Sequence, residues 1–401
     1  MSEILSMRRA GRFRRVVITL ALALLSAMTV SQVATAAGVV TTVAEPCVGS
    51  SNPTFYPNNH RMVVTSTGRR LALFDPDGSG VHLAWRDGDG PWSTKSIYGV
   101  SDEAPSDRPA SIALDGTGNA WVVWSGYNFS SPLPLRLRRL TNLDAPGGPT
   151  VGPVVTVQSA GQGNAFADLA FQGGRGFIVW LQRTGSTSYS LKTTQFSQLD
   201  TDTPTFENTA TLYSSSVSTT SGTLVPTAAG MRVVARAGSL KVYSNTSGAE
   251  WSAGSASTKA PAKAKPSAIA FGNDILATFQ AAPFKDDIVK VVRFSNTGSS
   301  VSTSLVTPRG YVHPSIAGNA SGAWVVMVAK GTTRTVVSRR FDGSTWGSDV
   351  TELSSSVTNG GDYAYPNALR EVDGTLRFLV DGKRCPTSNA RNAVLAFERT
   401  V

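Results

Sequence analysis

Short apolar runs, separated by turns rich in glycine and polar residues, recur along the chain and predict β-strands. The clearest pair lies between Pro109 and Trp124, where two apolar runs flank Asp115-Gly116-Thr117-Gly118. Asp-Gly supplies the positive φ angles that a tight hairpin needs, and Ala120 to Trp124 is rich in β-prone residues. We therefore predict a β-hairpin here. After the first forty or so residues, no long run combines helical periodicity with helix caps.

Degenerate copies of this hairpin recur at intervals of roughly 40 to 60 residues, as in propeller blades. Each copy is followed by a third strand and usually by a turn to a fourth. Such a unit cannot bury its faces alone and must stack on its neighbours around an axis. The sequence therefore predicts an all-β, seven-bladed β-propeller, with a six-bladed one as the alternative because the fourth unit is short. The predicted hairpins cover 62–76, 109–124, 166–180, 226–237, 266–279, 314–327 and 366–380.

The N-terminal segment 38–43 reads as a strand that belongs to none of the seven units, whereas the seventh unit has only three predicted strands. We predict that this segment is the missing outer strand and closes the ring. Cys47 follows it within four residues, and Cys385 lies between the second and third strands of the same blade. These are the two cysteines of the chain, and we expect them to form a disulfide in an oxidising compartment.

The first residues have the layout of an export signal. Five arginines precede the apolar run Val16 to Leu25, and Ala34-Thr35-Ala36 offers small residues for cleavage. We predict a signal peptide over residues 1–36, a single propeller domain over 37–401 and a secreted, extracellular protein. A membrane anchor is the alternative, but the apolar run is short, and we expect no membrane span in the mature chain. Arg14-Arg15 leaves the general secretory and the twin-arginine routes both open.

Charge narrows the choice of partners. Loss of residues 1–36, with their five arginines and one glutamate, lowers the formal net charge from +10 to +6. The remaining lysines and arginines are dispersed, which favours solubility, with a glycan or an anionic cell-surface polymer as a candidate partner. No motif indicates nucleic-acid binding, and we expect a monomer.

The sequence also predicts no cofactor and no metal site. The segment from Asp75 to Gly80 resembles the start of a calcium loop, but Arg86 stands where the loop needs a glutamate. The chain has three histidines and no cysteine cluster of the kind that holds zinc.

A second repeated turn ends in tryptophan after a polar, glycine-bearing stretch. It occurs at 86–92, 243–251 and 341–346. Here the chain resembles sialidase-type propellers and their Asp-box relatives, whose turns follow Ser-x-Asp-x-Gly-x-Thr-Trp between the third and fourth strands. The matching residues are Ser244, Gly248 and Trp251 in one turn and Gly343, Thr345 and Trp346 in another. The resemblance implies a propeller in which these turns are structural and lie away from the substrate face.

A sialidase of this type would need an arginine triad for the substrate carboxylate, a tyrosine nucleophile backed by glutamate, and an aspartate acid/base. The segment Phe55 to Arg61 does not match the Phe/Tyr-Arg-Ile-Pro motif that carries the first arginine of the family. We therefore assign no catalytic residue. The candidate components are Arg61, Arg108, Arg370, Asp107, Asp168, Tyr363 and Tyr365.

The residues just before the opening strand of each unit form a second candidate set. In chain order they are His60, Arg108, Ala165, Val225, Lys265, His313 and Tyr365. Four of them can carry positive charge or titrate near neutrality, and Tyr365 adds an aromatic face. We take His60, Arg108, Lys265, His313 and Tyr365 as candidate ligand-binding residues at a basic mouth suited to an acidic sugar. The alternative is that these loop residues share no function.

Fold does not fix function, so three hypotheses follow. The leading one is a secreted, non-catalytic propeller that binds a carbohydrate or another cell-surface ligand. The alternatives are an exo-acting glycoside hydrolase of sialidase type and an extracellular protein-interaction scaffold.

Overall fold

A computed structural model of the protein describes most of the chain after residue 37. The signal peptide predicted over 1–36, the domain boundary at residue 37, most of the calcium-like loop, and Cys47, Arg108, Lys265 and Cys385 lie outside the described residues. The described ranges are 38–44, 60–75, 80–98, 110–125, 134–159, 163–216, 221–237, 239–246, 250–258, 266–281, 287–295, 301–332, 334–354, 363–382 and 393–401.

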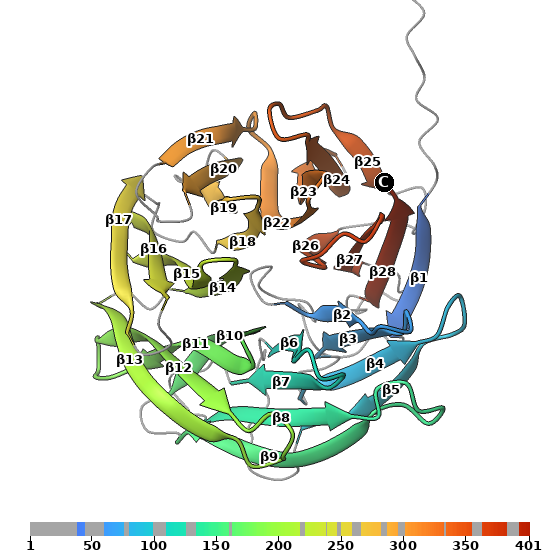
Figure 1. Ribbon diagram of the computed structural model, residues 1–401. Helices are drawn as coiled ribbons and strands as arrows, with labels where there is room; N and C mark the ends of the chain where they lie inside the picture. The colour runs from blue at the N-terminus through green and yellow to red at the C-terminus, as the bar shows by residue number, and fades with distance from the viewer. Residues whose placement is uncertain are drawn as a thin grey trace, which may run out of the picture. The chain divides into compact units, whose positions relative to one another are not determined.

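Seven four-stranded antiparallel sheets surround a central channel, which confirms the seven-bladed propeller (Figure 1). Blade 1 contains β2 (Met62–Val64), β3 (Arg70–Phe74), β4 (His82–Arg86) and β5 (Ser93–Ser96). Blade 2 contains β6 (Ala110–Leu114), β7 (Ala120–Trp124), β8 (Leu135–Thr141) and β9 (Thr150–Gln158). Blade 3 contains β10 (Asn164–Gln172), β11 (Arg175–Arg183), β12 (Tyr189–Ser197) and β13 (Thr205–Ser215).

The remaining blades repeat this order of strands from the channel outward. Blade 4 contains β14 (Gly222–Thr227), β15 (Gly230–Ala237), β16 (Ser239–Asn245) and β17 (Ser252–Thr258). Blade 5 contains β18 (Ser267–Phe271), β19 (Asp274–Ala281), β20 (Ile288–Ser295) and β21 (Val301–Val306). Blade 6 contains β22 (Tyr311–Asn319), β23 (Gly322–Lys330), β24 (Arg334–Phe341) and β25 (Val350–Leu353). Blade 7 contains β26 (Ala364–Ala368), β27 (Thr375–Gly382), β28 (Ala393–Thr400) and β1 (Val39–Ala44).

The N-terminal strand closes the ring as the sequence predicts. β1 pairs antiparallel with β28, from Val39 opposite Glu398 to Ala44 opposite Val394. The Thr41 hydroxyl also accepts hydrogen bonds from Arg86 Nη1 (2.8 Å) and Trp92 Nε1 (3.1 Å) in blade 1. The first strand of the chain therefore completes blade 7 and attaches it to blade 1.

The fourth blade begins earlier than the sequence predicts. Its innermost strand, β14, starts at Gly222, and Val225 and Pro226 lie inside it. The predicted hairpin starts at Pro226, four residues later. The inner strand has only one hydrogen-bonded neighbour, and proline is tolerated in such an edge strand.

Apolar side chains from neighbouring blades interlock to form the core. In β7 of blade 2, Trp124 packs in the cluster shared with blade 1, and Trp121 packs in the cluster shared with blade 3. Both are essentially inaccessible to solvent. The two faces of one strand alternate, so a strand buried on both sides reads as the continuous apolar run Ala120–Trp124.

The turn of the same hairpin is held by its own aspartate. The Asp115 carboxylate accepts hydrogen bonds from the Thr117 N–H (2.9 Å), the Asn119 N–H (3.2 Å) and Trp121 Nε1 (3.0 Å). The Asp342 carboxylate accepts in the same way from the Ser344 N–H (2.8 Å) and the Thr345 N–H (2.7 Å). These carboxylates therefore stabilise turns.

A belt of mostly polar residues runs around the channel at one register position of the innermost strands. Strand pairing and the bond from the Leu73 N–H to the Arg61 carbonyl place these residues opposite equivalent positions of the second strands. We call this set the belt, and its members, from blade 1 to blade 7, are Arg61, Ser111, Asp168, Thr223, Ser267, Ser315 and Asn367.

Belt side chains join five pairs of neighbouring blades. Ser111 Oγ accepts from the Leu169 N–H (3.3 Å), and Ser315 Oγ accepts from the Ala368 N–H (3.0 Å). In the same way, the Asp168 carboxylate accepts from the Leu224 N–H (2.8 Å), Ser267 Oγ from the Ile316 N–H (3.3 Å) and Asn367 Oδ1 from the Arg61 N–H (3.3 Å). At the junction of blades 1 and 2 the His60 carbonyl replaces the side chain and accepts from the Ile112 N–H (2.7 Å). Side-chain oxygens thus satisfy the backbone donors that an unpaired strand edge leaves exposed.

The disulfide between Cys47 and Cys385 stays a prediction, and the strand order allows it. Ala44 lies opposite Val394, which lies opposite Asp381, so β1 and β27 run about 10 Å apart at this end of the blade. Each cysteine follows the last residue of its strand by three positions, a reach of about 10 Å per segment.

We therefore expect a Cys47–Cys385 peptide in a non-reducing digest of the protein, analysed by mass spectrometry. Reduction should lower the free energy of unfolding by about 2–4 kcal/mol because it frees the loop that encloses the propeller. Alkylation of both thiols without prior reduction would contradict this pairing.

Candidate functional site

Asp168, the belt residue of blade 3, lies at the centre of a polar network inside the channel. Its carboxylate is fully buried and accepts hydrogen bonds from Ser111 Oγ (2.8 Å), Thr223 Oγ1 (3.1 Å) and the Leu224 N–H (2.8 Å). Burial opposes ionisation, but His60, Arg370 and the Leu224 N–H outweigh it and lower the pKa of Asp168 to about 2. The channel therefore contains a permanent buried anion.

His60 connects this anion to an arginine. Its Nδ1 lies 2.8 Å from Asp168 Oδ1, and Arg370 Nε lies 3.0 Å from His60 Nε2. Arg370 Nη2 lies 2.8 Å from each of the two ring nitrogens, so the guanidinium contacts the imidazole at both. Burial and the charge of Arg370 also lower the pKa of His60, against the opposing effect of Asp168. The imidazole is therefore a neutral link between a carboxylate and a guanidinium.

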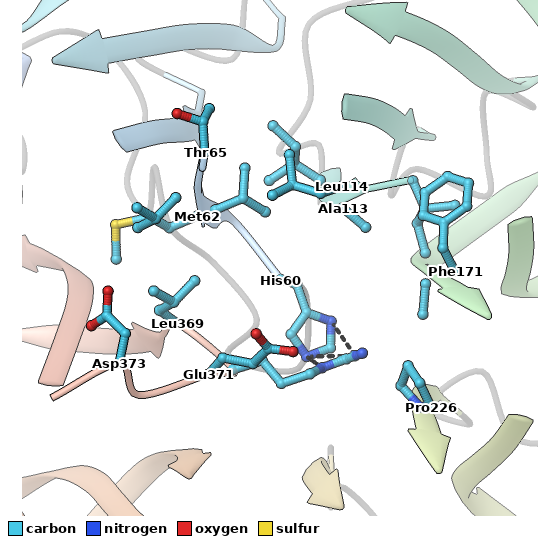
Figure 2. Close-up of a pocket in the computed structure, with 16 residues that line it drawn as sticks. His60, Met62, Thr65, Ala113, Leu114, Phe171, Pro226, Leu369, Glu371 and Asp373 are labelled. Atoms are coloured by element: carbon cyan, nitrogen blue, oxygen red, sulfur yellow. Dashed lines mark hydrogen bonds between the residues drawn. The ribbon is translucent and has the colours of Figure 1, made fainter. Parts of the chain in front are cut away.

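Arg370 spans the channel from blade 7. Its Nη2 donates to the Leu224 carbonyl of blade 4 and lies 3.8 Å from Asp168 Oδ2. Blades 4 and 7 are not neighbours in the ring, so this bond crosses the channel. We call His60, Asp168 and Arg370 the channel network, and the contact between His60 and its arginine partner is drawn in Figure 2.

The position of Arg370 is set by its backbone. The Gly318 N–H of blade 6 donates to the Arg370 carbonyl (3.0 Å), and the Val372 N–H donates to the Gly318 carbonyl (3.1 Å). A Cβ at Gly318 would lie 2.4 Å from Ile269 Cδ1, so any larger residue there would displace the Ile269 side chain. The turn of blade 7 is thereby fixed to blade 6, and its arginine is directed across the channel.

A cavity of about 320 Å³ lies beside the channel network, at the end of the channel where the innermost strands finish (Figure 2). Its polar lining, apart from His60 and Arg370, comprises Thr65, Glu371 and Asp373. Thr65 donates to Asp144 and Asp373 pairs with Arg377, whereas Glu371 makes no side-chain hydrogen bond within the described ranges. The apolar walls come from blades 1, 2, 3, 4 and 7 and include Met62, Ile112, Leu114, Leu169, Phe171, Pro226 and Leu369.

His313 and Tyr365, two of the predicted ligand-binding residues, lie together in blades 6 and 7. Their rings pack edge to face with centroids 4.1 Å apart. Each occupies a β-bulge with positive φ, 53° at His313 and 51° at Tyr365, and Phe166 of blade 3 has the same conformation at 54°. A bulge redirects one side chain, which here places two aromatic rings in contact across a blade junction.

The bulges also change which residues of the predicted ring are equivalent. Phe166, rather than Ala165, corresponds to His313 and Tyr365, because each of the three lies two residues before a belt position. Val225 is buried in the core between blades 4 and 5. His60 belongs to the channel network, so the ring is not one continuous set of side chains.

His313 does not supply the positive charge that the sequence suggested. Burial, together with the nearby charges of Arg334 and Lys330, lowers the pKa of His313 to about 3, against the opposing effect of Asp287. Both His60 and His313 are therefore neutral near pH 7. The described members of the predicted ring therefore carry no charge near pH 7.

The candidate sialidase components do not form one open site. Tyr363 is buried, and its hydroxyl donates to the Ser354 carbonyl (3.1 Å). Arg61 is also buried and belongs to the belt, and Asp107, like Arg108, lies outside the described residues. Of these components, Asp168 and Arg370 are bonded into one network, through His60.

Sequence reasoning missed the role of Arg370, although the repeat contains a signal. Arg370 lies three residues after the belt residue of its blade, a position filled by Val64, Leu114 and Phe171 in blades 1 to 3. A charged residue at a position that is otherwise apolar indicates a specific partner. That comparison requires the correct register, which the bulges hide.

Comparisons with known proteins identify the fold. No protein-family model matches the chain, and no curated protein sequence matches it. Phage phi92 endosialidase is similar in structure, with a TM-score of 0.52, 10% identity, and 91% of this chain and 69% of that chain covered. A protein of unknown function from Dyadobacter fermentans gives a TM-score of 0.51, 10% identity, and coverage of 90% and 99%.

A fucoside-bound lectin from Aleuria aurantia is a more distant likeness, with a TM-score of 0.46, 10% identity, and 86% and 96% of the two chains covered. That score is too low to support any argument. At such low identity the two stronger likenesses show the propeller fold alone, which this chain shares with a sialidase-type propeller.

Two further findings concern the described residues only. No helix among them has the length and hydropathy needed to cross a bilayer. No group of three or more of their histidine, cysteine, aspartate or glutamate side chains is placed to hold a metal ion.

We expect Asp168→Asn to lower the free energy of unfolding in urea by about 3–5 kcal/mol, because it leaves the Arg370 charge buried without its counter-charge. Asp200→Asn, on an exposed turn, should change it by less than about 0.5 kcal/mol. Adding Arg370→Leu to Asp168→Asn should recover part of the loss. A double variant less stable than Asp168→Asn alone would argue against the network.

His313→Gln should flatten the dependence of unfolding free energy on pH. Because the pKa of His313 is about 3 in the folded protein and about 6.5 when unfolded, the unfolded chain binds one more proton between these values. The contribution of His313 to the free energy of unfolding is therefore greatest above about pH 6.5. It falls as the pH drops below that value, by up to about 1.4 kcal/mol per pH unit.

Urea unfolding measured between about pH 4.5 and 6.5 tests this, because most carboxylates stay ionised there. Tyr365→Phe, which keeps the imidazole, should retain the slope. Parallel curves for His313→Gln and the unmodified protein would show that His313 titrates normally.

Proposed function

We propose that this protein is a secreted, non-catalytic propeller that binds a carbohydrate in the channel cavity. The observation that carries the proposal is the lining of that cavity. Apolar walls from five blades face a few polar groups, and the volume of about 320 Å³ is within the range of small-molecule sites. The channel network forms a fixed polar boundary beside it.

Phe171 supplies an aromatic surface for the carbon face of a sugar ring. Its side chain is half-buried, lines the cavity and packs edge-on against Phe196 with centroids 5.7 Å apart. A ring supported in this way keeps its orientation, so little conformational entropy is lost on binding.

Glu371 is the polar group best placed to select the ligand. Its exposed carboxylate lines the cavity and can accept hydrogen bonds from sugar hydroxyls. The guanidinium of Arg370 is already used by His60 and Leu224, and Asp373 adds a second carboxylate to the lining. This balance favours a neutral sugar, in contrast to the acidic sugar suggested by the predicted ring.

The same carboxylates support binding without hydrolysis. Glycoside hydrolysis generally uses two carboxyl groups on opposite sides of the scissile bond. Asp168 is enclosed, with a pKa of about 2, so it cannot donate a proton near neutrality. Asp373 is paired with Arg377, which leaves Glu371 as the available carboxylate among the described lining residues.

We expect a glycan array to identify neutral glycans, and titration calorimetry with the strongest of them to give lower affinity for Phe171→Ala and Glu371→Gln. Each should lose about tenfold, from lost stacking area or a lost charge-assisted hydrogen bond. The matched control is Phe271→Ala. Phe271 of blade 5 packs against Phe341 of blade 6, with ring centroids 5.6 Å apart, and does not line the cavity.

Equal losses of affinity in Phe171→Ala and Phe271→Ala would show that the sugar binds outside the channel cavity. Hydrolysis of a fluorogenic sialoside or of a neutral aryl glycoside above background would contradict the non-catalytic assignment.

A further inference from the structure

Arginines at three junctions between blades meet a carboxylate on the neighbouring blade. Arg70 of blade 1 pairs with Glu398 of blade 7 at 2.6 Å, and Arg399 of blade 7 pairs with Glu352 of blade 6 at 2.8 Å. Arg139 lies 3.7 Å from Asp202 at the junction of blades 2 and 3. At these junctions the protein supplies its own counter-charge.

At the junction of blades 1 and 2, Arg69 crosses to the Leu143 carbonyl and is paired with Asp87, but two other cations there have no such partner. Lys95 of β5 donates to the Pro149 carbonyl of blade 2, and Arg138 of β8 donates to the Ile97 carbonyl of blade 1. Arg138 Nε also donates to the Gly152 carbonyl at 2.6 Å. Within the described part of the chain, neither cation contacts a carboxylate.

Lys95 and Arg138 donate hydrogen bonds to carbonyl groups, but a carbonyl group has no net charge that would neutralise them. Lys95 and Arg138 are both half-buried, and burial lowers the pKa of each. Loss of hydration without a counter-charge disfavours the charged form, so an anion that entered this junction would be favoured by both groups.

The two cations lie at the same edge of blade 1. Lys95 and Ile97 are two residues apart on the same edge, about 7 Å along the chain, and the Arg138 guanidinium is bonded at Ile97. Both side chains cross the same junction, one from each side. An anionic polymer that lies along this edge can therefore meet both cations.

An aromatic surface lies next to these cations. Lys95 Nζ is 5.5 Å from the centroid of the half-buried Trp85 ring. Gly148, at φ 83°, packs against this indole so closely that a Cβ there would lie 2.5 Å from Cε2. The indole is thus supported by the backbone of blade 2 and keeps a fixed position at the junction.

We propose that the junction of blades 1 and 2 binds an acidic polysaccharide. Lys95 and Arg138 hold a sulfate or carboxylate group of the polymer, and Trp85 contacts the adjoining sugar ring. This site is separate from the channel cavity and does not depend on the function proposed for that cavity.

The test measures binding of the full mature protein to immobilised dextran sulfate, polygalacturonate and unmodified dextran by surface plasmon resonance. We expect one or both anionic polymers to bind and the neutral dextran not to bind. Lys95→Gln and Arg138→Gln should each weaken binding about tenfold or more, the loss typical of a charge-assisted hydrogen bond. Binding to dextran sulfate alone would identify the group as a sulfate, and binding to polygalacturonate alone would identify a carboxylate.

Two controls separate this site from general attraction. Arg175→Gln removes the same charge from a guanidinium already paired with Glu207 at 2.7 Å, and Phe171→Ala alters the channel cavity. Both should bind the anionic polymers as the unmodified protein does, and circular dichroism should show all variants folded. Equal weakening by Arg175→Gln and Arg138→Gln, no effect of either junction variant, or no binding to either anionic polymer would overturn the proposal.

Discussion

The propeller depends on satisfying the channel-facing edge of its innermost strands. Each blade has one strand with no neighbour on its inner side, and a buried N–H without a partner is costly. The belt solves this by placing a short polar side chain where it accepts from the next blade, as Ser315 does from Ala368. Blade stacking and donor satisfaction are therefore achieved by the same bonds.

Asp168 extends this solution and changes its consequences. A serine at a belt position accepts one backbone bond, but a carboxylate brings a buried charge that needs compensation. His60 of blade 1 supplies a hydrogen bond, and Arg370 of blade 7 supplies the opposite charge. They are 108 and more than 200 residues away from Asp168 in the sequence. The compensation occupies the channel itself. A site in the channel must therefore lie to one side of the network, which is where the cavity is found.

The sequence was informative where local chemistry decides structure. The hairpin from Ala110 to Trp124 follows from two continuous apolar runs and an Asp-Gly turn, and the closing strand follows from counting strands in the last unit. The fourth hairpin begins before Pro226, because the edge strand β14 tolerates a proline in its ladder. The bulges at His313 and Tyr365 were also hidden, because one extra residue changes the register without changing the apolar pattern.

The site was harder to predict than the fold for a related reason. Residue type alone suggested that His60 and His313 are positively charged, yet each lies beside cations in a buried place, and both are neutral. Composition likewise cannot show which arginine has a carboxylate within reach. Several arginines of the described chain pair with a carboxylate on the next blade, as Arg70 does with Glu398, so cations without such a pair are informative. Among the described residues, Lys95 and Arg138 contact carbonyl groups and no carboxylate, and Glu371 in the cavity makes no side-chain hydrogen bond. A ligand would supply these partners, which the proposed sugar does in the cavity and the proposed acidic polymer does at the blade junction.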